Sequence, residues 1–116
     1  MSHLIEMDEL NLSMESIREA ARKVGLHVTE RMTNVYGGTR VTGLAVSLPG
    51  WYKPVTYTEM GGKVKASYDN YLSNWGEITE LEKFHVQVMA EMEGYDPSTV
   101  VLATRKTGET VFELEV

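Results

Sequence analysis

Two glycine pairs constrain the fold of this chain more than any other feature. Gly37–Gly38 stands within "NVYGGTRVTG" and Gly61–Gly62 within "TEMGGKVKASY", and each pair separates two segments rich in β-branched and aromatic residues. Gly-Gly is a favoured two-residue hairpin loop, because both central positions of the turn need a positive φ. A phosphate-binding loop would instead lead from a strand into the N-terminus of a helix. The context therefore predicts two β-hairpins rather than two phosphate cradles.

The second glycine pair also predicts a register. A two-residue loop pairs Met60 with Lys63, and strand alternation then places on one face the polar side chains of Thr56, Thr58, Lys65 and Ser67. The opposite face carries Val55, Tyr57, Val64, Ala66 and Tyr68, which we expect to face the core. The first hairpin has apolar residues on both faces, which indicates a bulge near Gly43 or burial on both sides.

Helical periodicity appears in two places outside these hairpins. The first helix follows a cap at Asn11 or Ser13, ends at Gly25, and carries an apolar stripe of Met14, Ile17, Ala21 and Val24. The second begins at a capping box formed by Thr79 and Glu82, and Gly94 ends it. Its predicted inward stripe consists of Leu81, Phe84, Val88, Met89 and Met92.

Strands complete the predicted fold at both ends of the chain. His3–Glu9 reads as a short first strand, and a hairpin around "KTGE" closes the sequence. The order is β-α-β-β-β-β-α-β-β. We therefore expect one α+β domain over residues 1–116, with an antiparallel sheet and two helices packed on one face.

Composition excludes several classes of protein. The 116 residues are 42% hydrophobic, as in ordinary globular proteins, and contain no cysteine, which removes disulfides and thiolate chemistry. The sequence has neither a signal peptide pattern nor the roughly 18 consecutive apolar residues of a membrane span. We expect a cytoplasmic protein that has no association with a membrane and needs no cofactor.

The charge distribution is uneven along the chain. The net charge of −6 argues against binding of long nucleic acids. Residues 31–75 nevertheless contain five basic and two acidic residues, a net charge of +3, while the remainder carries −9. The same segment holds seven of the ten aromatic residues. A cationic, aromatic middle within an acidic chain is the sequence feature that most favours a binding function.

This segment supplies the candidate site. The predicted ligand-binding residues lie at loops or strand ends and are Tyr36, Arg40, Trp51, Lys53 and Trp75. Aromatic rings there could stack on a planar ligand while a cation meets its anionic group, as in nucleotide binders. The alternative interpretation is that the same aromatics bury a homo-oligomer or partner interface.

Catalytic chemistry has little support in the sequence. Its serines lie in no nucleophile elbow or triad, and the spacing of Glu82 and His85 is only half of what a di-iron helix pair requires. We therefore predict no catalytic and no metal-ligating residue. His85 lies on the buried stripe of the second helix, and a core histidine is the favoured interpretation. A further role at the ligand site, or in a small hydrolase or isomerase, stays open.

Several segments together resemble one family. They are "MSHLIEM", "SIREAARKVGLHV", "VYGGTR", "GGKVKASYDNYLSNW" and "FHVQVMAEM". The chain resembles the hypothetical chloroplast reading frame thirty-five group, a small domain of unknown function in algal plastids, cyanobacteria and some phages. The resemblance implies a single α+β domain without established catalytic residues, and it matches His85 to a histidine of the family. Kinship with phage proteins would suit sequestration of a nucleotide signal.

The leading functional hypothesis is a non-enzymatic protein that binds a small, nucleotide-like anion. The second is a protein-interaction or homo-oligomeric assembly module.

Overall fold

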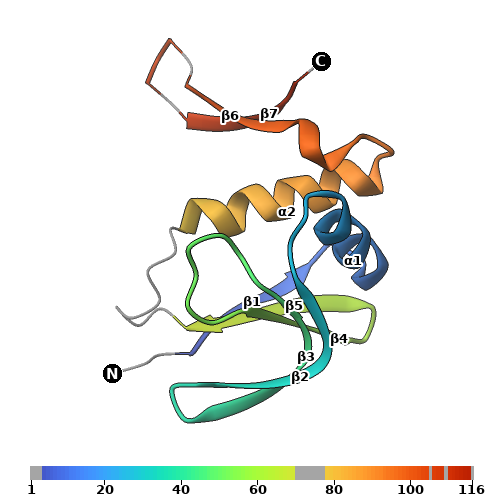
Figure 1. Cartoon of the computed structure of the whole chain (residues 1–116), viewed down its shortest axis with the longest axis vertical. Coiled ribbons are helices and arrows are strands. Elements are labelled where there is room, and N and C mark those ends of the chain that lie inside the picture. The colour runs from blue at the N-terminus through green and yellow to red at the C-terminus, as the bar shows by residue number, and fades with distance from the viewer. Residues whose placement is uncertain (1–3, 70–77, 105, 109, 116) are drawn as a thin grey trace.

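The computed structural model describes residues 4–69, 78–104, 106–108 and 110–115. Strands β1 (Leu4–Leu10), β2 (Val28–Tyr36), β3 (Thr39–Val46), β4 (Val55–Met60) and β5 (Lys63–Asp69) form an antiparallel sheet in the order β1-β5-β4-β3-β2. Helices α1 (Met14–Lys23) and α2 (Ile78–Met92) cover one face of it (Figure 1). The predicted α+β fold and its order of elements are confirmed.

The last two strands form a sheet of their own. A short 3₁₀ helix, η1 (Pro97–Thr99), leads into β6 (Val100–Thr104), which pairs with β7 (Thr110–Leu114). This hairpin lies on the far side of α2 from the five-stranded sheet (Figure 1). The helix α2 is therefore a central layer between two sheets.

Both glycine pairs form hairpin turns, as predicted. The φ angles are 57° and 85° at Gly37 and Gly38, and 60° and 79° at Gly61 and Gly62. The register of the second hairpin is also confirmed, because Met60 pairs with Lys63, Thr58 with Lys65 and Thr56 with Ser67. Its apolar face joins the core, while its polar face turns away from the helices.

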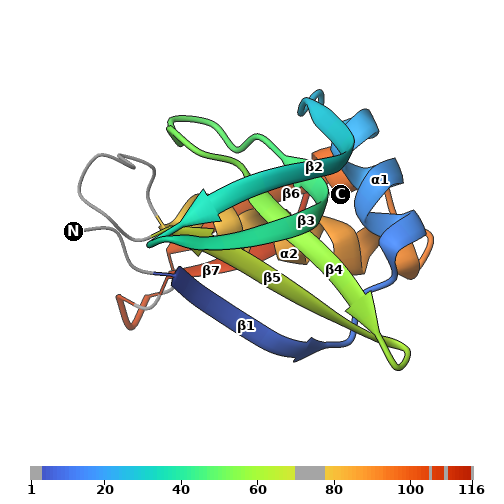
Figure 2. The ribbon, with the colours of Figure 1, turned by 90° about the horizontal axis from the view of Figure 1, so that it is seen from below.

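The first hairpin contains the predicted irregularity. Glu30 and Arg31 of β2 lie opposite the single residue Leu44, which is a bulge, and Arg31 has a φ of 51°. Beyond this point β3 no longer pairs with β4, whose partners in β3 are limited to Leu44–Val46. The β2–β3 hairpin thus leaves the plane of the sheet and reaches across its polar face (Figure 2). We call residues 32–43 the arm.

Gly43 lies where the arm crosses β4. A Cβ atom at this position would lie 2.4 Å from the backbone oxygen of Tyr57 and 2.9 Å from Cγ2 of Thr58. The close approach of two backbones, rather than an unusual φ, explains why glycine stands here.

We expect Gly43→Ala to destabilise the protein by about 2 kcal/mol, because the added methyl group must push the arm away from β4. Urea denaturation followed by circular dichroism measures this change. The neighbouring Thr42→Ala removes only an exposed hydroxyl bond to Thr33 and should cost less than about 1 kcal/mol. Equal stability of Gly43→Ala and the parent chain would contradict the crossing.

Helix α1 has the predicted signals at both ends. Ser13 is the N-cap and accepts a hydrogen bond from the backbone nitrogen of Ser16 at 3.1 Å. Gly25 follows the helix with a φ of 78°, and the nitrogen of Leu26 donates to the carbonyl of Ala21 at 2.8 Å. This is the pattern of a glycine-terminated helix.

Helix α2 differs from prediction in two respects. It begins at Ile78, so Thr79 is a residue of the first turn and the prediction of Thr79 as N-cap is wrong. Leu81, Phe84 and Val88 face the core as expected, but Met89 and Met92 are 46% and 47% exposed. The helix instead buries Gln87 and Ala90. The predicted apolar stripe assumes that the helix packs on one side only. It misses the burial of Gln87 and Ala90 because η1 and β6 also contact the helix.

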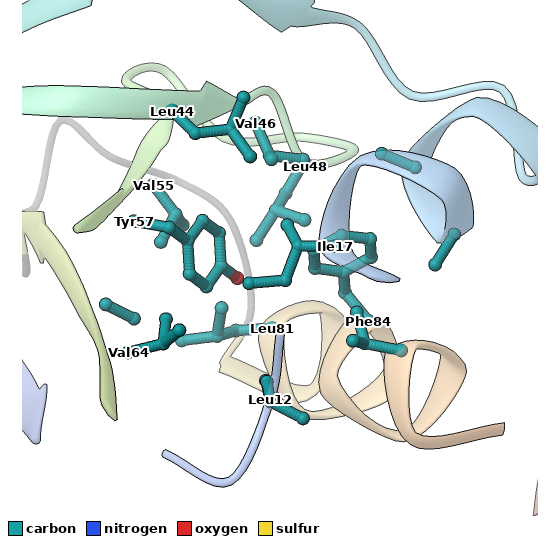
Figure 3. Packing of buried hydrophobic residues seen from close by; sticks show 14 residues of the cluster. Leu12, Ile17, Leu44, Val46, Leu48, Val55, Tyr57, Val64, Leu81 and Phe84 are labelled. Carbon is teal, nitrogen blue, oxygen red and sulfur yellow. The ribbon is translucent and has the colours of Figure 1, made fainter. Parts of the chain in front are cut away.

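The core lies between the five-stranded sheet and the two helices. Tyr57 extends from β4 towards the helices, between the side chains of Ile17 and Leu81 (Figure 3). Its ring meets that of Phe84 at a centroid distance of 6.2 Å, in an edge arrangement. The sheet is joined to both helices through this cluster.

Candidate ligand site

A groove of about 960 Å³ runs along the face of the sheet that the helices leave uncovered. Its walls are the arm, at residues 39–42, and strand β1, at residues 4–9. Its floor is the polar face of the second hairpin, with Thr58, Met60, Lys63 and Lys65. The groove exists because the arm departs from the sheet at the bulge and at Gly43.

Charges of both signs line this groove. Lys65 of the floor forms an ion pair with Glu6 of β1 at 2.6 Å, and the hydrogen bond to Glu6 raises the pKa of Lys65. Lys63 donates to the side chain of Asn11 at 2.9 Å. Arg40 is exposed on the arm, and it forms no hydrogen bond or ion pair within the part of the chain that the structure describes. It is therefore available to an anion.

Near its turn, the arm is tied to β4 by buried polar groups. The hydroxyl of Tyr36 donates to the carbonyl of Pro54 at 2.7 Å and lies 2.7 Å from Oγ1 of Thr56. Asn34 donates to the same Oγ1 at 3.0 Å. The side chain of Tyr36 is wholly buried, and this burial raises its pKa. Its ring has no free face on which a ligand could stack.

Lys53 is held beside the same end of the arm. Its Nζ donates to the carbonyl of Val35 at 2.9 Å and lies 3.3 Å from the carboxylate of Asp69, which is only 2% exposed. Val35 pairs with Arg40 across the hairpin. The structure thus brings Tyr36, Arg40 and Lys53 together near the end of the arm, but of these three only Arg40 lines the groove.

The two tryptophans do not complete a stacking site there. Trp51 packs against the core on the helical face, with its ring centroid 5.5 Å from that of Tyr68. This is the opposite face of the sheet from the groove. Trp75 lies outside the described residues. The reason for the separation is strand alternation, since Tyr68 and Ser67 point to opposite sides of β5.

We expect Tyr36→Phe to destabilise the protein by about 1–2 kcal/mol, because the carbonyl of Pro54 and the hydroxyl of Thr56 lose a buried partner. Urea denaturation measures this loss. Tyr95→Phe is a suitable control, since Tyr95 is 53% exposed and surface changes of this kind stay within about 0.5 kcal/mol. An unaltered midpoint for Tyr36→Phe would mean that the hydroxyl network does not hold the arm.

His85 belongs to the core rather than to the groove. It is 9% exposed, and its Nε2 lies 2.9 Å from the hydroxyl of Tyr57. Burial lowers the pKa of His85 to about 4 and raises that of Tyr57 well above its usual value. The imidazole is therefore neutral near pH 7, and one hydrogen bond joins its Nε2 to the hydroxyl of Tyr57.

The acidic wall of the groove was not predicted. The sequence places Lys65 on the polar face of its hairpin, but nothing in it assigns a role to Glu6, Asp8 and Glu9 of β1. Alternation along β1 separates Glu6 from Ile5 and Met7, and so predicts that Glu6 points away from the core. That Glu6 shares this face with Lys65 depends on the pairing of β1 with β5, which joins residues 54 to 65 positions apart and could not be seen from either strand alone.

The described residues contain neither a metal-binding group nor a membrane-spanning helix. Among the residues that the structure describes, no three histidine, aspartate or glutamate side chains are grouped closely enough to hold a metal ion. None of the described helices has the length and apolar character needed to cross a membrane.

The fold and groove define a small α+β domain with an arm folded over the open face of its sheet. Comparison of the chain with models of protein families, with curated proteins and with solved structures finds no match. The resemblance to the hypothetical chloroplast reading frame thirty-five group therefore stays a prediction.

Proposed function

We propose that this chain is a non-enzymatic binding protein that holds a small, nucleotide-like anion in the groove between the arm and β1. The observation that carries the proposal is a groove of about 960 Å³ with the unengaged guanidinium of Arg40 on its wall. Small-molecule sites commonly measure about 300–1,000 Å³ and combine apolar walls with a few polar groups. Arginine suits such a site, because its planar donors match phosphate and carboxylate oxygens.

The charges of the chain support this location. Three of the five basic residues in the cationic middle segment line the groove, namely Arg40, Lys63 and Lys65. The apolar part of a ligand would contact Leu4, Val41 and Met60, which line the same groove. Because Tyr36 and Trp51 are packed into the protein, ring stacking by these two residues is not part of the proposal.

Isothermal titration calorimetry at low ionic strength, with nucleoside mono-, di- and triphosphates and cyclic dinucleotides, tests this function. We expect at least one of them to bind, and Arg40→Gln to weaken its binding about tenfold or more through loss of a charge-assisted hydrogen bond. Lys106→Gln, in the turn of the distant β6–β7 hairpin, is the matched control and should leave the affinity unchanged. Folded protein that binds nothing in this panel would refute the proposal.

A homo-oligomeric assembly module is the second candidate. Met89 and Met92 of α2 and Leu102 of β6 are 46%, 47% and 55% exposed, and exposed apolar side chains on neighbouring elements favour an interface. Light scattering coupled to size exclusion would show a dimer or larger species, and Leu102→Lys together with Met89→Lys would dissociate it. A monomer at high protein concentration would exclude this candidate.

A further inference from the structure

The two walls of the groove carry opposite charges. The arm contributes Arg40, and the floor next to it contributes Lys63 and Lys65. The facing wall, β1, contributes the carboxylates of Glu6, Asp8 and Glu9. A ligand that is purely anionic would meet repulsion along β1. A ligand with an anionic group at one end and hydrogen-bond donors at the other would match both walls.

The ion pair between Lys65 and Glu6 joins floor and wall. Its two side chains are 39% and 36% exposed, and ion pairs with this degree of exposure are weak in water. Both partners can therefore exchange this pairing for contacts with a ligand at little cost. Lys65 would then meet an anionic group, and Glu6 would accept hydrogen bonds from donors.

We infer that the groove recognises a mononucleotide by both of its ends. The phosphate of the nucleotide would bind to Arg40 and to the floor lysines, Lys63 and Lys65. Two adjacent hydrogen-bond donors at the other end of the nucleotide would bind to the carboxylates of β1. This inference rests on the proposed function and specifies the ligand that it takes. A carboxylate has two acceptor oxygens, so it pairs well with two neighbouring donors. In a nucleotide these donors are the two hydroxyls of ribose or the N–H groups on one edge of guanine.

Calorimetric titrations of the full chain with GMP, dGMP, AMP, dAMP, guanosine and inorganic phosphate test this assignment. We expect a mononucleotide to bind at least tenfold more tightly than either guanosine or phosphate, because only it reaches both walls. A preference for AMP over dAMP would identify ribose as the donor, and a preference for GMP over AMP would identify guanine. Either preference supports the inference.

Variants of the two walls separate the contributions. Arg40→Gln should weaken the preferred mononucleotide about tenfold while leaving guanosine unchanged. Glu6→Gln and Asp8→Asn should each weaken the binding of the mononucleotide by about fivefold or more. The binding of inorganic phosphate should not weaken in these variants, because each of them removes a carboxylate that repels an anion. Glu113→Gln on β7, far from the groove, serves as the control, and thermal melting confirms that each variant is folded.

The outcomes distinguish this inference from the function on which it rests. Binding of phosphate-containing ligands that depends on Arg40 but not on Glu6 or Asp8 would overturn the two-ended recognition and leave an anion-binding protein. Failure of every ligand to bind would overturn both. Equal affinity for phosphate and for all four mononucleotides would also refute the role of the acidic wall.

Discussion

Replacement of Tyr57 by alanine is expected to destabilise the protein by about 4 kcal/mol, which is the usual cost of removing a buried aromatic ring. The ring is wholly buried and meets Phe84 and His85 at centroid distances of 6.2 and 5.8 Å. Domains of this size are stable by only about 5–15 kcal/mol, so the variant would lose a large part of its stability. Urea and thermal denaturation measure the change.

Tyr57→Phe separates the hydrogen bond from the packing. It keeps the ring but removes the hydroxyl that lies 2.9 Å from Nε2 of His85. We expect a loss of about 1–2 kcal/mol, because the buried nitrogen is left without its partner. If Tyr57→Phe were as damaging as Tyr57→Ala, the hydroxyl rather than the ring would hold the sheet to α2, and the packing argument would fail.

Acidification from pH 7 to pH 4 is expected to remove about 3 kcal/mol of stability through His85 alone. Burial lowers the pKa of His85 from 6.5 to about 4, so the folded state binds fewer protons than the unfolded state between these values. Stability from this group is therefore complete above pH 6.5 and falls as the pH drops through the interval towards pH 4. The magnitude follows from about 1.4 kcal/mol for each pH unit.

Two measurements check this pH dependence. The chemical shifts of the imidazole, followed by NMR, should show no protonation of His85 until the pH approaches 4. His85→Gln keeps a polar group able to accept from Tyr57 but cannot titrate, so its stability should vary much less between pH 6.5 and pH 4. A titration midpoint near pH 6.5 for the imidazole of His85 would refute its burial.

Other groups affect stability at more acidic pH. Hydrogen bonds lower the pKa values of the exposed carboxylates of Glu19, Glu30 and Asp96, so their contributions to stability are lost as the pH falls through these lowered pKa values.

The parts of the fold that could be predicted are those determined by short-range sequence signals. Gly37–Gly38 and Gly61–Gly62 specify their turns through φ, and Ser13 and Gly25 specify the ends of α1, because these effects act over a few neighbouring residues. Alternation around Gly61–Gly62 then determines which side chains share a face. Errors arose where a second packing partner intervened, as at Met89 and Met92, which a one-sided helix would have buried.

The candidate site was less predictable than the fold. Tyr36 and Arg40 flank one turn, so their proximity follows from the sequence, but what each side chain contacts does not. The hydroxyl of Tyr36 donates to the carbonyl of Pro54, and Nζ of Lys53 donates to the carbonyl of Val35. Each hydrogen bond joins residues that are 18 positions apart in the chain. The sequence does not distinguish an exposed aromatic or basic side chain from one that is held by such a hydrogen bond.

The amino-acid sequence by itself determined the order of the strands and helices, the turns, the helix ends of α1 and the register of the second hairpin. Only the tertiary structure decided that the arm crosses β4 at Gly43, that β1 joins β5, and that Arg40 consequently faces a wall of carboxylates across a groove. The physical reason is range: φ preferences, caps and alternation act between near neighbours, whereas the path of a bent hairpin depends on packing between segments that are distant in the chain.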